Sequence, residues 1–301
     1  MVDLLPQKVT IVEVGPRDGL QNEAAIVPVE VKLALIEGLA EAGLSVIEAT
    51  SFVSPKWIPQ MADAIPLMQQ LKQLEHVRYP ALTPNIQGFE AAIQAGATEV
   101  AIFAAASESF SQKNINCSID ESMKRFEPIM VRAEALDVPV RGYVSCVMGC
   151  PYEGAVPASS VADVASRLYE MGCYEISLGD TIGVGNPKIA RHLIENVTAR
   201  IPVENLAAHF HDTYGQALVN ILAVLQLGVN TIDSAISGLG GCPYAEGASG
   251  NVATEDVVYM LDGMGIETGI NLSKLIETGK MISSHLGQAT KSRVATALAN
   301  K

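Results

Sequence analysis

The chain has 301 residues, of which 49% are hydrophobic and 18% are charged, and its formal net charge is −13. A chain of this length and apolar content can bury a large core, as one large α/β domain or as two ordinary domains. The excess of negative charge argues against nucleic acid and anionic membrane surfaces as partners, since both attract basic patches. No apolar run approaches the length of a membrane span, so we expect no membrane partner.

The five cysteines form an odd set without paired spacing. This pattern favours reduced thiols in a reducing compartment over a disulfide framework. The first expected strand begins near Val9, which leaves no room for a signal or transit peptide. Residues 298–301 match no peroxisomal or lipidation signal. We therefore expect the protein to be cytoplasmic.

Short apolar runs alternate with amphipathic segments along the whole chain, and the apolar runs predict eight strands. The expected strands are Val9–Val14, Ser45–Thr50, Tyr79–Thr83, Val100–Ala105, Val140–Cys146, Tyr174–Leu178, Leu206–Phe210 and Thr231–Ile236. Helical patterns lie between them, such as the apolar spacing from Val31 to Ala42. Repeated β-then-α units predict a parallel sheet, and eight units in one chain predict an α/β fold of the closed (β/α)₈ TIM-barrel type.

A faint internal repeat supports this count, because four glycines each follow an expected helix end and precede an apolar run. These glycines are Gly43, Gly96, Gly172 and Gly228. The long middle interval contains an extended segment, 107–118, before the capping-box pattern at Ser118–Glu121. The alternative, an open doubly wound sheet, is disfavoured because the turn Gly15–Gly19 is not a nucleotide-binding fingerprint.

No linker or low-complexity stretch divides the chain. We therefore expect one domain over residues 1–301, with the barrel at about 8–265. Residues after about 270 exceed the eight β/α units and predict extra C-terminal helices, packed on the barrel or in a dimer contact.

His209 and His211 lie two residues apart at the end of the seventh expected strand. Side chains at positions i and i+2 of a strand point to the same face, so both imidazoles can reach one ion in the barrel mouth. Two satisfied buried histidines are the alternative reading. The neighbouring Asp212 and the total of only five histidines favour metal ligation.

Two further residues offer oxygen ligands near the same end of the barrel. Asp18 follows the first expected strand, beside Arg17, and is either a turn residue or a metal ligand. Asn251 follows a glycine-rich segment after the eighth strand and is either a helix N-cap or an amide ligand. Arg17 is either an anion clamp or a surface charge. Together with the two histidines, these oxygens suit Mg²⁺ or Mn²⁺, whereas two histidines and one carboxylate can also hold non-haem Fe²⁺.

Glu48 ends the second expected strand and Asp180 ends the sixth. The carboxyl ends of barrel strands form the active face of such folds. Each of these carboxylates can therefore orient Arg17 or a water molecule, or can simply cap the turn that follows.

The segment Gly238–Asn251 is too rich in glycine to form a stable helix or strand, and it carries Cys242. A near-duplicate motif, Gly149–Ala155, carries Cys150. The longer glycine run favours Cys242 as the catalytic residue, because a lid has to move to admit substrate. The remaining cysteines are expected to be small buried hydrophobic residues: Cys117, Cys146 and Cys173.

Seven stretches of the chain resemble the 3-hydroxy-3-methylglutaryl-coenzyme A (HMG-CoA) lyase family. They are Glu13–Glu23, Ser45–Trp57, Lys113–Ile119, Val140–Gly154, Tyr174–Gly185, His209–Ala217 and Gly238–Asp256. The resemblance extends from about Val9 to about Gly269. The Arg-Asp and His-x-His motifs are shared more widely among metal-dependent barrel enzymes, whereas the loop around Cys242 is specific to this lyase family.

The resemblance implies a carbon–carbon lyase that cleaves (S)-HMG-CoA to acetyl-CoA and acetoacetate by metal-assisted retro-Claisen chemistry, in leucine catabolism and ketone-body formation. It implies that a divalent cation, Mg²⁺ or Mn²⁺, is held by Asp18, His209, His211 and Asn251. Arg17 would stabilise the enolate oxygen, Glu48 would position Arg17, and Cys242 would take part in proton transfer.

The resemblance also implies that Arg17, Gln21 and Asp180 bind the acyl-CoA substrate, and it suggests a homodimer. The group that removes the hydroxyl proton stays open between Asp18, His209 and Cys242. Two alternatives remain: a related metal-dependent aldolase or acyl-CoA-condensing synthase, and a non-catalytic barrel that binds an acyl-CoA. The aldolase or synthase would not be expected to need Cys242 in its loop, and the intact Arg17, Cys242 and four expected metal ligands argue against the non-catalytic barrel.

Overall fold

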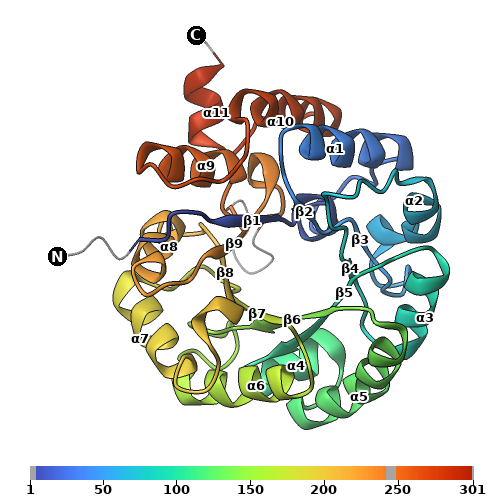
Figure 1. Ribbon diagram of the computed structural model, residues 1–301, viewed down its shortest axis with the longest axis vertical. Coiled ribbons are helices and arrows are strands. Elements are labelled where there is room, and N and C mark those ends of the chain that lie inside the picture. Colours follow the sequence, from blue (N-terminus) through green and yellow to red (C-terminus); the bar gives the residue numbers. More distant parts are fainter. Residues whose placement is uncertain (1–4, 242–248, 300–301) are drawn as a thin grey trace.

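The computed structural model describes residues 5–241 and 249–299. The described residues form a parallel sheet of nine strands that curls into a barrel, with helices on its outer side (Figure 1). The strands are β1 (Thr10–Glu13), β2 (Val46–Ile47), β3 (Thr50–Ser51), β4 (Ala81–Leu82), β5 (Val100–Ala105), β6 (Val140–Ser145), β7 (Glu175–Asp180), β8 (Leu206–Phe210) and β9 (Thr231–Ser234). Their hydrogen-bonded order is β2-β1-β9-β8-β7-β6-β5-β4-β3.

The two end strands of this order, β2 and β3, are halves of one barrel strand. Val46 forms a parallel bridge with Arg78, just ahead of β4. The Ile47 N–H also donates to the Arg78 carbonyl at 3.0 Å, and the Ala49 N–H donates to the Pro80 carbonyl at 3.0 Å. These bonds close the sheet, so the predicted (β/α)₈ TIM barrel is confirmed. The second strand, predicted as continuous, is interrupted at Glu48 and Ala49.

The helices surround the barrel (Figure 1). They are α1 (Val29–Glu41), α2 (Ala64–Gln70), α3 (Ile86–Gln94), α4 (Glu108–Ile115), α5 (Ile119–Leu136), α6 (Ala158–Glu170), α7 (Pro187–Val197), α8 (Ala217–Leu225), α9 (Thr254–Gly263), α10 (Leu272–Leu286) and α11 (Arg293–Leu298). The predicted extra C-terminal helices are α10 and α11. Helix α10 packs closely on α1, because a Cβ atom added at Gly38 would lie 2.8 Å from the Thr278 hydroxyl.

Local sequence signals were reliable guides to most helix ends. Ser118 and Glu121 form the expected capping box at the start of α5. Asn186 caps α7 with Pro187 in its first turn, as its N-cap preference predicts. The four repeat glycines all have φ near +100°, between 95° and 109°. This backbone conformation is one that residues with a Cβ atom rarely adopt.

One local expectation was wrong, and one of the two readings of Asn251 is excluded. The segment 107–118, expected to be extended, contains helix α4, which begins because the Ser107 hydroxyl accepts a hydrogen bond from the Phe110 N–H at 3.1 Å. The N-cap of α9 is Ala253, so Asn251 does not cap that helix. Ser107 therefore acts as a helix start signal that the sequence analysis missed.

Among the described residues, no helix combines the length and the apolar character that crossing a bilayer requires.

A buried carboxyl group at the base of the barrel mouth makes stability depend on pH. Glu255 in α9 is fully buried and accepts the Ser237 N–H at 2.9 and 3.1 Å. Burial raises the pKa of this carboxyl from 4.5 to about 8. The folded state therefore holds a proton that the unfolded chain releases, and the stabilisation is present below about pH 4.5 and lost as the pH rises through about 8.

We expect Glu255→Gln to flatten the decline in the free energy of unfolding between about pH 5 and pH 8, because the amide does not ionise. Urea denaturation across this range measures the slope. Glu277→Gln, on the exposed face of α10, is the matched control and should keep the wild-type slope. An unchanged slope in Glu255→Gln would contradict the assignment.

Candidate metal centre and active site

The first element of the site is η1 (Gly15–Gly19), a short helical turn that follows β1. The Val14 carbonyl accepts the N–H groups of Arg17, Asp18 and Gly19 at 3.2, 2.7 and 3.1 Å. Gly15 is required here, because its N–H donates to Glu13 Oε1 at 2.8 Å and an added Cβ would lie 2.5 Å from that oxygen. This tight turn sets the direction of the Arg17 and Asp18 side chains.

The histidines come from the carboxyl end of β8. His209 lies in the strand and His211 lies just beyond it, so the i, i+2 spacing places both rings on one face. The ring centroids are 5.4 Å apart. Asp18 reaches the same point from η1, and the ligand atoms of Asp18, His209 and His211 all lie within 4.8 Å of one another. The structure thus brings three of the expected ligands together.

The free donor atoms of this cluster fit a divalent cation. His211 Nδ1 is buried and has no hydrogen-bond partner among the described residues. Burial and the nearby His209 lower the pKa of His211 to about 4, so its ring is neutral and offers a lone pair. His209 Nε2 lies 3.9 Å from Asp18 Oδ2, a spacing that two ligands of one ion can adopt. Two imidazoles with a carboxylate suit several divalent metals.

Asn251 also lies at the cluster and is almost fully buried. Its backbone forms an antiparallel bridge with His211. The side-chain Nδ2 donates to Asp18 Oδ2 at 2.8 Å and to the Leu239 carbonyl at 3.2 Å. In this structure the amide nitrogen, rather than the oxygen, therefore faces Asp18.

Arg17 is a buried cation held between two carboxylates. Its Nε lies 2.6 Å from Glu48 Oε2, and its Nη1 lies 2.7 Å from Asp18 Oδ1. Burial alone would lower the pKa of Arg17, but the charges of Glu48 and Asp18 outweigh it and raise the pKa above its ordinary value. For Asp18, burial alone would raise the pKa, but Arg17 and His209 outweigh burial and lower the pKa to about 2. Arg17 is therefore cationic and Asp18 anionic.

A second ion pair lies beneath the site, inside the barrel. Arg141 of β6 donates from Nη2 to Asp233 Oδ1 at 2.7 Å and from Nη1 to Oδ2 at 3.0 Å, and both side chains are fully buried. Asp233 of β9 lies 3.2 Å from His209 Nδ1 and also accepts the Ser177 hydroxyl at 2.7 Å. This geometry places the imidazole proton on Nδ1 and directs Nε2 toward Asp18.

Sequence reasoning missed Arg141 and Asp233. Both lie inside segments expected to be buried strands, and a charged residue in such a strand has to be paired. That rule is the signal that could have found them. The Tyr143 ring lies between the two arginines, 5.6 Å from the Arg17 guanidinium carbon and 4.9 Å from that of Arg141.

Three of the expected site residues carry a buried oxygen that lacks a partner among the described residues: Gln21 Oε1, Glu48 Oε1 and Asp180 Oδ1. Buried polar atoms are normally paired, so these orphan oxygens are available to accept hydrogen bonds from a bound molecule. The hydroxyls of Ser51 and Thr213, which sequence reasoning missed, are orphans of the same kind.

Asp180 holds a proton more readily than an ordinary aspartate. Its Oδ2 accepts the Gly185 N–H at 2.9 Å, and burial raises its pKa to about 6. Near neutral pH this carboxyl can therefore exchange a proton.

Of the two cysteines in the duplicated motif, the structure describes only Cys150. Cys242 lies outside the described residues. Cys150 is buried, its Sγ lies 3.0 Å from the Ser107 hydroxyl, and it accepts the N–H groups of Tyr152 and Glu153 at 3.3 and 3.4 Å. These bonds give Cys150 a structural role in the turn after β6.

Comparison with known proteins shows relatives along nearly the whole chain. Residues 8–282 match the HMGL-like family. The cytoplasmic 3-hydroxy-3-methylglutaryl-CoA lyase of Mus musculus is 61% identical over 296 residues, which cover 98% of this chain and 86% of the relative.

Solved structures agree in fold. Hydroxymethylglutaryl-CoA lyase from Pseudomonas aeruginosa has a TM-score of 0.97 and 55% identity, with 99% of each chain covered. An HMG-CoA lyase from Acinetobacter baumannii, solved with coenzyme A and 3-methylmalate, has a TM-score of 0.93 and 36% identity, covering 97% of this chain and 95% of that chain. The chain described here therefore belongs to the HMGL-like family.

Proposed function

We propose that this protein cleaves (S)-3-hydroxy-3-methylglutaryl-CoA to acetyl-CoA and acetoacetate, in leucine catabolism and ketone-body formation. The observation that carries the proposal is the Asp18, His209 and His211 cluster, with the paired cation Arg17 directly beside it. The 61% identity to a curated lyase supports the same reaction. The relative solved with coenzyme A supports an acyl-CoA substrate.

The cluster would hold a divalent cation, Mg²⁺ or Mn²⁺, through Asp18, His209, His211 and Asn251. The hard oxygen ligands support these ions over softer ones. Because the Asn251 nitrogen faces Asp18 here, ligation through the amide oxygen requires the carboxamide to rotate. The bound cation would polarise the tertiary hydroxyl of the substrate and lower its pKa.

Arg17 would meet the negative charge that develops when the carbon–carbon bond breaks. The departing acetyl thioester takes the bond's electron pair and becomes an enolate. Glu48 and Asp18 hold Nε and Nη1 of Arg17, which fixes the direction of the whole planar guanidinium. A cation oriented before the reaction stabilises the enolate oxygen without reorganisation.

Two proton transfers complete the reaction: removal of the hydroxyl proton and protonation of the enolate carbon. Asp18, His209 and Cys242 are the candidates for the first transfer. We assign Cys242 to proton transfer on the family resemblance, since it lies outside the described residues. Gln21 and Asp180 would bind the substrate through their orphan oxygens.

We further propose one domain over residues 1–301, a homodimer and a cytoplasmic location. Close packing of α10 on α1 supports one domain. The family resemblance is the support for a dimer. Among the described residues, four cysteines are free, which supports a reducing compartment, and the curated relatives include both cytoplasmic and mitochondrial forms.

The test of the function is a coupled assay for acetoacetate from HMG-CoA, with and without a chelator. We expect activity that is lost on metal removal and restored by Mg²⁺ or Mn²⁺, because the metal activates the substrate hydroxyl. Activity that survives complete metal removal would overturn the mechanism.

Arg17→Met should lower kcat by about 10²–10³-fold, because it removes the enolate's donor. Metal affinity should change little, since Arg17 contributes no metal ligand. Steady-state kinetics and Mn²⁺ titration measure the two effects. Arg132→Met, on the surface of α5, is the control, and near-normal turnover of Arg17→Met would contradict its role.

His211→Ala should weaken Mn²⁺ binding at least about tenfold, because even residues that only orient metal ligands typically contribute that much. Isothermal titration of the metal-free protein with Mn²⁺ measures the affinity directly. His192→Ala, an exposed position on α7, should leave the titration unchanged. If His211→Ala binds as tightly as the wild type, His211 is not a ligand.

A further inference from the structure

Glu23 links the turn that carries Arg17 and Asp18 with two segments far along the chain. Its Oε1 accepts the Gly240 N–H at 3.0 Å, and its Oε2 accepts Gln288 Nε2 at 3.1 Å. Its backbone carbonyl accepts Gln60 Nε2 at 2.8 Å. The carboxylate itself is half-buried and touches none of the expected metal ligands.

Gly240 is the backbone position on which this contact acts. Its φ is +89°, and an added Cβ would lie 3.1 Å from Asn251 Nδ2 and 3.2 Å from the Gly19 Cα. Its carbonyl accepts the Gly250 N–H at 3.1 Å, and the next residue, Gly241, bridges to Ser249. The Gly240 N–H is therefore held by Glu23, while the Gly240 carbonyl pairs with the segment that leads to Asn251.

Asn251 connects this backbone with the expected metal centre. Its Nδ2 is shared between the Leu239 carbonyl, the residue before Gly240, and Asp18 Oδ2. A shift of the peptide between residues 239 and 240 would therefore move an acceptor of Asn251. The contact between Asn251 and Asp18 would change with it.

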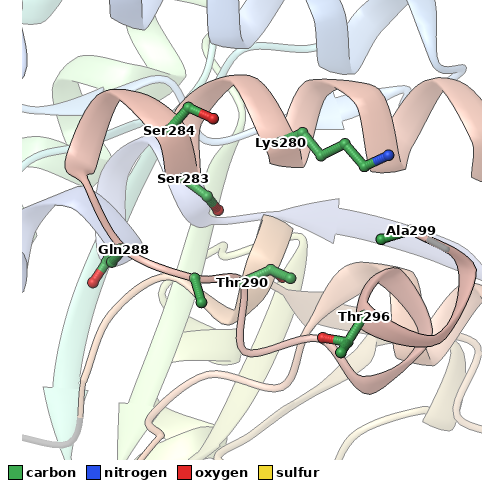
Figure 2. Close-up of a pocket in the computed structure, with 8 residues that line it drawn as sticks. Lys280, Ser283, Ser284, Gln288, Thr290, Thr296 and Ala299 are labelled. Carbon is green, nitrogen blue, oxygen red and sulfur yellow. The ribbon is translucent and has the colours of Figure 1, made fainter.

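The second oxygen of Glu23 is anchored by the C-terminal region. Gln288 lies on the segment that connects α10 with α11, beside a pocket of about 330 Å³ (Figure 2). In the same segment the Lys291 N–H donates to the Ser237 carbonyl at 3.0 Å. The C-terminal segment thus packs against residues 237–240 and holds the carboxylate from the other side.

We propose that Glu23 is a positioning residue: by binding the Gly240 N–H it holds Asn251 in register with Asp18 for metal binding and turnover. This inference rests on the proposed lyase function for its kinetic consequence. Its structural part, the effect on the backbone and on metal affinity, does not depend on which substrate is cleaved.

The test compares Glu23→Ala, Glu23→Gln and Gln288→Ala in the full-length protein. Glu23→Ala removes the acceptor of the Gly240 N–H, whereas Glu23→Gln keeps an amide oxygen there. Gln288→Ala removes only the second contact. Hydrogen–deuterium exchange of the peptide that contains Gly240, Mn²⁺ titration and kcat with KM are measured for each variant.

In Glu23→Ala we expect faster exchange at Gly240. Mn²⁺ affinity and kcat should each fall by about tenfold, a loss that corresponds to one charge-assisted hydrogen bond. KM should change less than kcat. Glu23→Gln should recover most of each loss, and Gln288→Ala should stay close to the wild type. If Glu23→Ala does not fold, Glu23→Asp, whose shorter side chain draws the oxygen away from Gly240, should show the same losses.

Unchanged exchange and Mn²⁺ affinity in Glu23→Ala would overturn the proposal. Equal losses of affinity and turnover in Gln288→Ala without faster exchange at Gly240 would also overturn it, because the carboxylate would then only anchor the C-terminal segment. A wild-type protein that fails to cleave HMG-CoA would refute the lyase function alone. The exchange and titration results would still decide the role of Glu23.

Discussion

Arg141 and Asp233 form a salt bridge in the interior of the barrel, where neither side chain is accessible to solvent. Removing one partner of a buried pair typically costs about 3–5 kcal/mol, because the remaining charge loses a buried partner of opposite sign. The pair also sets the geometry above it. Asp233 holds His209 Nδ1 at 3.2 Å, and the opposite ring nitrogen is thereby directed to the barrel mouth. The orientation of His209 therefore depends on a salt bridge in the barrel interior.

From this pair a chain of polar contacts continues to the active face. His209 faces Asp18, Asp18 is paired with Arg17, and Arg17 is paired with Glu48. These residues come from β8, from η1 and from the interruption between β2 and β3. The interruption places the Glu48 carboxylate beside the guanidinium, so the local departure from a regular strand coincides with a residue of the site. Within this chain of contacts, Arg17 and Asp18 each stabilise the charged form of the other.

Much of the fold followed from the sequence, because the alternation of apolar runs and helical patterns leaves few ways to bury both. The expected strand near Val100 and that near Leu206 agree with β5 and β8. Two local outcomes depended on individual contacts. The Ser107 hydroxyl started helix α4, and the backbone of Asn251 paired with His211 instead of capping α9. Neither outcome is visible in the hydrophobic pattern.

By itself the sequence determined the parallel barrel, the adjacency of Arg17 and Asp18, and the shared face of His209 and His211, since these depend on spacing along one segment. Only the tertiary structure decided which atom of Asn251 faces Asp18, which carboxylate orients His209, and that Glu23 reaches Gly240 and Gln288. Such contacts join residues far apart in the chain. Their geometry is set by closure of the barrel and by the need to pair every buried charge, and neither condition acts within a single segment.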